Sequence, residues 1–420
     1  MSTSCKVIII AKLIKLNLYY FFSSRLNSLK KDSFSFLVSR IAITSIALGM
    51  AVMLVSFSIL EGFQKRIKDK IFSFSGHIQI TKYDTKKSFE ETPISVNSSL
   101  YKNYKSNSEI EKIQVFSLKP GLLKTKEGVN GIILKGISND FHIDKFAKNL
   151  VEVRFLHLND TSYSKDILVS KIIANKMRLR LNDTVLIFFV QNPPRFRKVT
   201  VCGIYESGLE EFDNLIVLGD IKLNQKLNNW NDTLVGGYEI FLSDFSAIDT
   251  VAKTVMNEMD YDMQLEKITD KYIQIFDWLA LLDRNVIIFL VLILLVACFN
   301  MVSTLSIMIM ERTNMIGVLK SVGATNKQIR AIFIYNGIFI VLKGLALGNI
   351  IGLGLCFIQY TFNFIPLDPE NYYMSTVPIE WNWQVIVGLN MLTFTLISLV
   401  LIIPVMIISN IKPVNSIKFN

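Results

Sequence analysis

The sequence is poor in the residues on which enzyme and metal chemistry depend. It holds 3 histidines and 4 cysteines among 420 residues. His77, His142 and His157 lie far from one another and from cysteines at metal-ligand spacing, so no metal site is expected. No Gly-x-x-x-x-Gly-Lys-Ser/Thr segment occurs, which excludes a phosphate-binding loop of that type. Because no nucleophile elbow or carboxylate pair stands out either, we predict no catalytic residues and no enzyme activity in this chain.

Charge is nearly absent from four long segments, whereas hydrophobic residues make up 51% of the whole chain. At 1.5 Å per residue, a helix of about 20 apolar residues crosses the hydrocarbon layer of a bilayer. We therefore predict an α-helical membrane protein with four transmembrane helices, at 41–60, 284–310, 331–362 and 384–409.

The placement of charge predicts the topology. The net charge of +10 could suggest nucleic-acid binding, but Lys and Arg outnumber Asp and Glu in segments 1–40 and 311–330 and in the tail 410–420, whereas loop 363–383 has no Lys or Arg. Basic loops stay in the cytoplasm, so both termini are expected there and no nucleic acid is expected as a partner. Within segment 1–40, residues 7–22 suit an interfacial helix, with a disordered leader as the alternative.

The long segment 61–283 then lies outside the cytoplasm. Short β-like runs at 77–80, 130–134, 167–169, 185–190, 198–204 and 238–242 alternate with helical patterns at 171–179 and 247–259. We predict a large mixed α/β extracytoplasmic domain, inserted between helices 1 and 2 and of a size that allows two lobes. Clusters of Gly, Pro, Asn and Asp at 119–121, 182–183 and 192–194 indicate turns. Cys202 is the only cysteine in this segment, so no disulfide is expected within it.

The sequence of the connector 311–330 predicts a short amphipathic helix. Ile316, Leu319 and Lys320 fall on one face, Gly323 suits the helix end, and Thr325 or Asn326 suits the cap of the next helix. From the pattern alone, this helix could insert into a groove on another protein or lie on lipid headgroups.

Several segments resemble a known family. They are 46–50, 61–64, 76–78, 131–136, 203–208, 211–213, 311–320 and 323–324, together with Pro366, Tyr372, Tyr373, Pro378, Trp381, Pro404, Lys412 and Pro413. In their order along the chain and in their amino-acid sequence, they are similar to the lipoprotein-releasing permeases of the LolC and LolE type, within the FtsX- and MacB-like permeases of ABC transporters. The resemblance covers essentially the whole chain.

The resemblance implies a permease subunit in the bacterial inner membrane that extracts lipoproteins and releases them to a periplasmic LolA-like carrier for the outer membrane. It also implies a second permease, either the same chain or a sister, and a separate LolD-like ATPase that uses ATP and Mg. No cofactor is expected on this chain. Connector 311–330 would be the coupling helix, with contacts from Glu311, Ile316, Gly317, Leu319, Lys320 and Gly323.

The family's lipid cavity lies between the first and second spans. Its candidate lining residues are Met50, Met53, Leu54, Phe57, Leu60, Phe289, Leu292 and Val296, each of which could instead face lipid or the protein core. The family's carrier-docking hairpin corresponds to the short turn 190–197, with Pro193, Pro194, Arg195 and Phe196, although an exposed turn without a partner fits equally well.

The third span holds two further features. Gly344, Gly348 and Gly352 recur every four residues and form a smooth stripe, which favours close helix packing. Lys343 lies well inside this span and is expected to face protein, water or a partner carboxylate.

Three other functions stay open at the level of sequence. The chain could be an FtsX-like mechanotransmission permease that activates external hydrolases, or a MacB-like exporter permease that works with a periplasmic adaptor. It could also be a membrane receptor with a sensory external domain.

Overall fold

The computed structural model describes residues 34–84, 91–152, 156–158, 163–368, 372, 374–406 and 408. The chain divides into a helical unit, formed by residues up to 63, 279–366 and from 376 onward, and an α/β unit, formed by 64–278 and 367–375. The predicted interfacial helix at 7–22 and the tail 410–420 lie outside the described residues.

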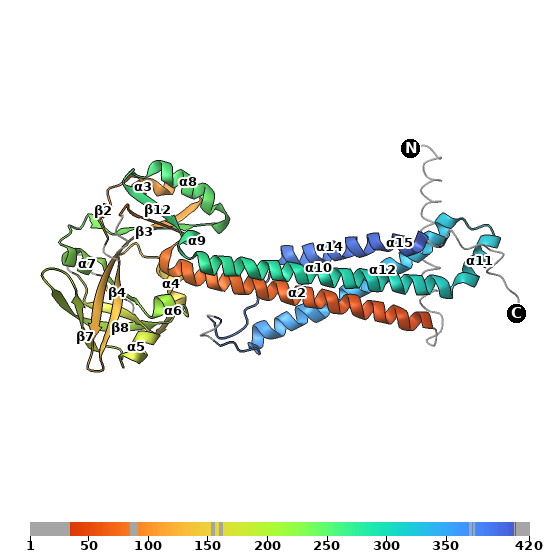
Figure 1. Ribbon diagram of the computed structural model, residues 1–420, viewed down its shortest axis with the longest axis horizontal. Coiled ribbons are helices and arrows are strands. Elements are labelled where there is room, and N and C mark those ends of the chain that lie inside the picture. The colour runs from red at the N-terminus through yellow and green to blue at the C-terminus, as the bar shows by residue number, and fades with distance from the viewer. Residues whose placement is uncertain are drawn as a thin grey trace, which may run out of the picture. The chain divides into compact units, whose positions relative to one another are not determined.

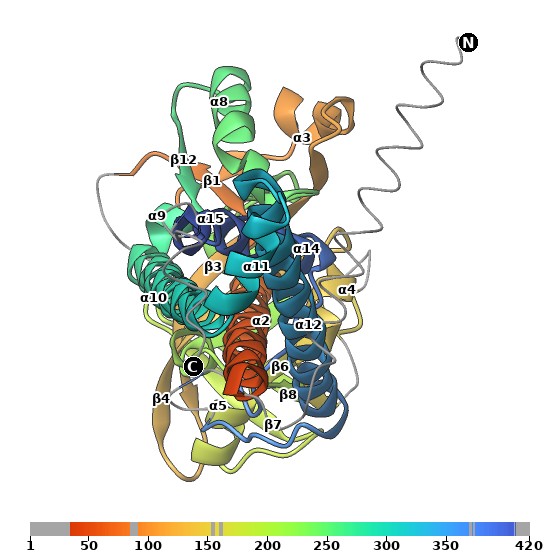
Figure 2. The same cartoon turned by 90° about the vertical axis from the view of Figure 1, so that its right-hand side faces the viewer.

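Among the described residues, four helices are long and apolar enough to cross a membrane. They are α2 (Phe34–Ser75), α10 (Ile273–Glu311), α12 (Asn326–Phe362) and α14 (Trp383–Val400), the last followed by α15 (Ile402–Met406). They run side by side in the helical unit (Figures 1 and 2). One core of buried side chains joins them, including Ile46, Met301, Phe333 and Ile397. The four predicted apolar helices are therefore present, in the predicted order.

The first two of these helices extend well beyond their predicted apolar segments. Helix α2 continues through the charged stretch 65–70 to Ser75, and α10 begins at Ile273. Hydropathy locates only the apolar part of a helix, whereas the helix itself continues until a residue ends it. Gly76 ends α2: its φ is +61°, and its N–H donates a hydrogen bond to the Phe72 carbonyl.

The glycine stripe of α12 lies against α2. A Cβ built on Gly344, Gly348 or Gly352 would meet atoms of α2 at 2.8, 2.7 and 3.0 Å, respectively Ile46 Cβ, Ala47 O and Ala51 Cα. All three glycines are buried. Because backbone and Cβ atoms cannot move aside as a flexible side chain can, glycine is required for this close approach.

In the part of the α/β unit that the structure describes there are twelve strands: β1 (Ile78–Lys82), β2 (Ile94–Ser95), β3 (Ile110–Lys124), β4 (Val129–Ile137), β5 (Leu150–Glu152), β6 (Asp166–Ser170), β7 (Thr184–Phe189), β8 (Arg195–Tyr205), β9 (Ile216–Asp220), β10 (Leu234–Val235), β11 (Gly237–Leu242) and β12 (Met263–Lys267). Ten form a mixed sheet in the order β12-β1-β11-β3-β4-β9-β6-β8-β5, with β7 paired to both β3 and β8. Strand β2 pairs with β10.

The pairings of β7 close six of these strands into a ring, β3-β4-β9-β6-β8-β7. The ring encloses a packed apolar core in which Ile187, Val201 and Val217 are fully buried. Of the remaining four strands, β12, β1 and β11 extend the sheet on the other side of β3 in an antiparallel arrangement, and β5 pairs with β8. The long strand β3 therefore belongs to both parts of the sheet.

Short helices connect the strands. They are α3 (Ser99–Asn103), α4 (Ile143–Phe146), α5 (Lys171–Lys176), α6 (Glu210–Asp213), α7 (Ile221–Asn228), α8 (Ile248–Glu258) and α9 (Ile268–Lys271), with 3-10 turns η1 (Tyr104–Ser106), η2 (Ala147–Asn149) and η3 (Phe245–Ala247). The sequence predicts α5 and α8, and the structure confirms both.

Each of the six predicted β-like runs corresponds to a strand, with His77 and Val190 one residue outside the strand ends, but the turn predicted at 119–121 is wrong. These residues lie inside β3, where Pro120 pairs with Ile133 and Gly121 with Ile132. Here β3 exchanges its neighbour β11 for β7. A Cβ on Gly121 would come within 2.9 Å of Ile187 Cγ2 on β7. The glycine therefore allows β7 to pack closely against β3 and does not form a turn.

Candidate functional site

The predicted coupling connector contains a distinct helix, α11 (Thr313–Ser321), between α10 and α12. Figure 1 shows it at one end of these two helices. Ile316 and Gly317 are buried, and Leu319 packs against the core of the helical unit. The face that the sequence predicts for a partner therefore points toward the helices of this same chain.

Lys320 is held by the C-terminal part of the helical unit. Its ammonium donates a hydrogen bond to the Ile408 carbonyl, 2.9 Å away. Gly323 follows with a φ of +99°, and Thr325 caps α12 through a reciprocal hydrogen-bond pattern with Gln328. Of the two predicted caps, Thr325 is the one confirmed. These contacts fix the orientation of α11, so Lys320 positions the connector.

The outward face of α11 and its exit consists of Asn314, Val318, Ser321 and Val322, all exposed. Val322 exposes 83% of its surface and Val318 52%. Glu311 is also exposed at the end of α10. The sequence pattern does not single out this face, because α11 has apolar residues on both sides and only the packing shows which side is covered.

The candidate cavity residues divide into two groups. Met50, Met53, Leu54 and Leu60 on α2 are buried, and Phe57 packs partly against the same core. Phe289, Leu292 and Val296 on α10 expose 63%, 52% and 58% of their surfaces. The structure therefore brings the α2 residues into the core of the helical unit and leaves the α10 residues facing outward, so the two groups do not share a surface.

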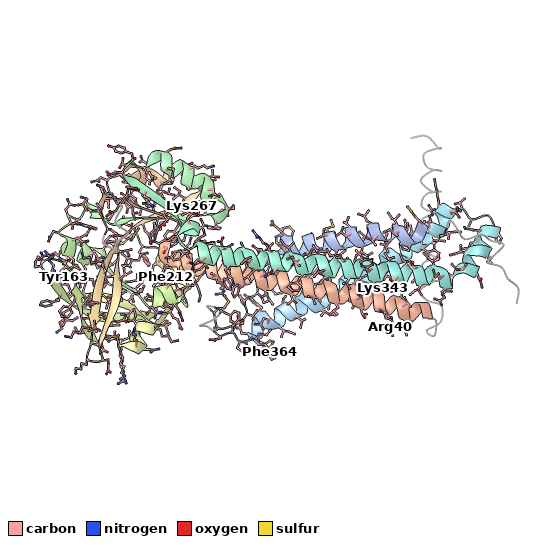
Figure 3. The ribbon with its side chains drawn as sticks, viewed as in Figure 1. Arg40, Tyr163, Phe212, Lys267, Lys343 and Phe364 are labelled. Atoms are coloured by element: carbon pink, nitrogen blue, oxygen red, sulfur yellow. The ribbon has the colours of Figure 1, made fainter. Side chains whose placement is uncertain are left out.

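Lys343 lies on the exposed side of α12, at the position labelled in Figure 3. Its ammonium sits 4.5 Å from the ring centroid of Phe339, one helical turn earlier. The aromatic face stabilises a cation in this position. Gly344, beside it in sequence, is buried on the side that packs on α2.

The predicted carrier-docking turn joins β7 and β8, which pair antiparallel up to Phe189 and Arg195. Pro193 and Pro194 are exposed, and the Asn192–Pro193 peptide bond is cis. The Arg195 guanidinium donates hydrogen bonds to the end of α7: Lys226 O, Leu227 O and Asn229 Oδ1, each at 2.9 Å. The arginine thus fixes the hairpin to the rest of the unit.

One face of this hairpin is apolar and open. Leu122, Phe188 and Phe196 lie side by side on β3, β7 and β8, as the strand registers place them, and expose 39%, 37% and 63% of their surfaces. Val190 at the turn exposes 77%. Aromatic side chains exposed on a rigid sheet are typical of protein-binding surfaces, so this face can dock a partner.

Two of the family-like external segments, 203–208 and 211–213, form one tight structure. The Asp213 carboxylate accepts hydrogen bonds from Ser207 N, Ser207 Oγ and Gly208 N at 3.1, 2.8 and 2.9 Å. Burial raises the pKa of Asp213 above its usual value. Phe212, which is labelled in Figure 3, stacks on Phe74 at the end of α2, with ring centroids 4.9 Å apart. These residues therefore anchor the end of α2.

Comparison with known proteins gives two family matches. Residues 39–256 match the MacB-like periplasmic core domain, and residues 287–413 match the FtsX-like permease C-terminal domain. The first match alone covers more than half of the chain.

Curated relatives match along most of their length. The lipoprotein-releasing system transmembrane protein LolC of Buchnera aphidicola subsp. Schizaphis graminum is 25% identical over 84% of this chain and 85% of that protein. LolC of Haemophilus influenzae is 24% identical over 82% of this chain and 85% of that protein, and LolE of the same organism 22% identical over 84% and 88%.

The fold and these sites define a multi-pass membrane protein with a large mixed α/β domain and a short helix between two of its spans. The chain belongs to the MacB-like periplasmic core domain family and carries an FtsX-like permease C-terminal domain. The resemblance to lipoprotein-releasing permeases that the sequence motifs indicate is thereby confirmed.

Proposed function

We propose that this chain is a permease subunit of an ABC transporter that extracts lipoproteins from the bacterial inner membrane and releases them to a periplasmic LolA-like carrier. The observation that carries this proposal is the similarity to LolC and LolE over more than four-fifths of the chain. A second permease subunit completes the membrane part. ATP hydrolysis belongs to a separate LolD-like subunit, which holds the ATP and Mg.

The need for such a machine follows from the lipid anchor. Transfer of acyl chains into water costs about 0.8 kcal/mol per CH₂, so a lipoprotein does not leave the bilayer unaided. The exposed apolar side of α10, with Phe289, Leu292 and Val296, is suited to contact acyl chains or the second permease. The buried α2 candidates can join that surface only if the helices separate, because Met50 and Leu54 now pack in the core.

The ATPase would dock on the outward face of α11. Val318 and Val322 offer apolar contact, and the hydrogen bond from Lys320 to Ile408 fixes the orientation of α11. A force on α11 would then pass directly to α10, α12 and the C-terminal part of the helical unit. The carrier would dock on the hairpin of β7 and β8, through Phe196 and Val190.

A co-purification experiment tests the function and both docking surfaces. The intact chain, purified from native membranes, should retain an ATPase and acylated lipoproteins, and should transfer lipoproteins to a carrier when ATP is added. Val322→Arg should lose the ATPase. Val190→Arg, matched in exposure and size, should keep the ATPase and lose transfer to the carrier.

Other results would point elsewhere. Recovery of a cell-wall hydrolase in place of lipoproteins would favour an FtsX-like mechanotransmission permease, and recovery of a periplasmic adaptor would favour a MacB-like exporter. The matches to an FtsX-like permease C-terminal domain and a MacB-like periplasmic core domain support these two alternatives. If Val322→Arg retains the ATPase, the outward face of α11 is not its docking site.

A further inference from the structure

A row of buried polar side chains crosses the sheet of the α/β unit. Glu239 on β11 faces Gln79 on β1 and Gln114 on β3, as the strand registers place them. Its carboxylate accepts hydrogen bonds from Gln79 Nε2 at 2.9 Å and Gln114 Nε2 at 2.7 Å. All three side chains are buried, and Glu239 is completely so. The carboxylate is therefore the centre of a network that joins three strands.

Lys135 on β4 connects this network to α2. Its ammonium lies 2.6 Å from the Glu239 carboxylate, and the side chain is 4% exposed. It also donates a hydrogen bond to the Phe74 carbonyl in the last turn of α2. Carbonyls at a helix C-terminus carry partial negative charge and lack partners within the helix, so a cation stabilises them. Lys135 thus caps α2 from the sheet.

Lys271 connects the same network to α10. It is the last residue of α9 and is separated from the start of α10 by Tyr272, and its ammonium donates a hydrogen bond to Gln79 Oε1 at 2.5 Å. Burial lowers the pKa of Lys271, although Glu266 and Glu239 oppose that shift. Tyr272 and Phe276, which follow, pack on Phe212 and Phe245. The end of α2 and the last residue of α9, from which the chain continues into α10, therefore meet one carboxylate-centred network.

Stability alone does not explain these charges. The free energy of desolvating two charges offsets much of the attraction between them. Well-packed apolar residues can therefore often replace a buried ion pair without loss of stability. What apolar residues cannot supply is a directional bond to the Phe74 carbonyl. The network is thus better suited to fixing the position of helix ends than to adding stability.

We propose that Glu239, Lys135 and Lys271 form a junction that fixes the ends of α2 and α10 to the sheet, so that a displacement of these helices moves the sheet with them. The three are positioning residues, since none has to touch a lipoprotein. This inference rests on the proposed function for its consequence in transport, but its structural part can be tested without transport.

The first measurement is a distance distribution between two spin labels within the α/β unit of the full-length protein. Labels at Asp69 on α2 and Val129 on β4, both exposed, are introduced after replacement of the four native cysteines by alanine. Lys135→Met combined with Glu239→Gln removes both charges and should broaden the distribution. The matched control, Lys171→Met with Glu206→Gln, removes an ion pair of similar length, 2.9 Å, on the surface and should leave it unchanged.

The second measurement uses the complex reconstituted with its ATPase in proteoliposomes. The junction variant should release at least about fivefold less lipoprotein per ATP hydrolysed, while hydrolysis itself continues. If the wild-type complex releases no lipoprotein, the proposed function fails, and the distance measurement still judges the junction.

An unchanged distance distribution in the junction variant would overturn the proposal, as would equal broadening in the surface control. Should the double variant fail to fold, Lys271→Met provides the same test, because it leaves the pair of Lys135 and Glu239 intact and removes only the bond to Gln79. In that variant, the distance distribution between a spin label in the first turn of α10 and one at Val129 should broaden.

Discussion

His77 shows how the core of the α/β unit controls a single side chain. Its Nδ1 accepts a hydrogen bond from the Leu242 N–H at 3.0 Å, and its ring packs 4.2 Å from the ring of Phe72. Burial, with a smaller contribution from Lys145, lowers the pKa of His77 from 6.5 to about 4. The histidine is therefore neutral in the folded unit at neutral pH.

This lowered pKa predicts a loss of stability in acid. The unfolded chain binds a proton at His77 below pH 6.5 and the folded chain only near pH 4, so the stabilisation is complete above pH 6.5 and declines as the pH falls toward 4. At pH 5 the expected loss is about 2 kcal/mol. Hydrogen exchange at the Leu242 amide, corrected for intrinsic rates, should show this loss between pH 7 and pH 5. His77→Gln should abolish the difference, and the exposed control His157→Gln should preserve it.

At the scale of elements, the contact between α2 and α12 depends on one stripe of glycines. Gly348→Leu should separate the two helices, since its Cβ would meet Ala47 O and Met50 Cβ at 2.7 Å. The expected result is a thermal midpoint several degrees lower in detergent, because overpacking costs about 1–3 kcal/mol. Gly354→Leu, on the same helix with no atom within 4 Å of a built Cβ, should leave the midpoint unchanged. Equal effects of both variants would show that the stripe has no special role.

At the scale of the whole molecule, the proposed function requires that α11 and the α/β unit lie on opposite sides of the membrane. The basic connector and the acidic loop 363–383 predict this arrangement. In a cysteine-free background, Lys148→Cys should react with a membrane-impermeant maleimide in intact spheroplasts. Ser321→Cys should react only after permeabilisation. Labelling of both from the outside would separate α11 from any cytoplasmic ATPase and remove the basis for its coupling role.

Much of the helical unit follows from the sequence. Four apolar runs predict the four long helices, and the predicted cap Thr325 is confirmed at the start of α12. The polar extension of α2 from residue 61 to Ser75 is not predicted, because hydropathy does not register a helix outside the membrane. The turn predicted at 119–121 is wrong for a related reason. Pro120 and Gly121 are common in turns, and only the pairing of β7 with β3 shows why they occur within a strand here.

The sequence indicates that the charged residues of the junction are buried, but it does not predict which of them pair. A single charge within an apolar strand, such as Glu239 in β11 or Lys135 in β4, indicates a partner inside the protein. Nothing along the chain says which partner, because the two residues are 104 positions apart and come together only through the pairing of β11, β3 and β4.

The sequence by itself determined the four apolar helices, the positions of six strands and the family, because hydrophobicity, strand propensity and motif sequence are properties of short segments. Only the tertiary structure decided which face of α11 is covered, which candidate cavity residues are buried, and that Lys135 meets Glu239. Those outcomes depend on contacts between segments far apart in the chain, where strand register and helix packing select one face of each element over the other.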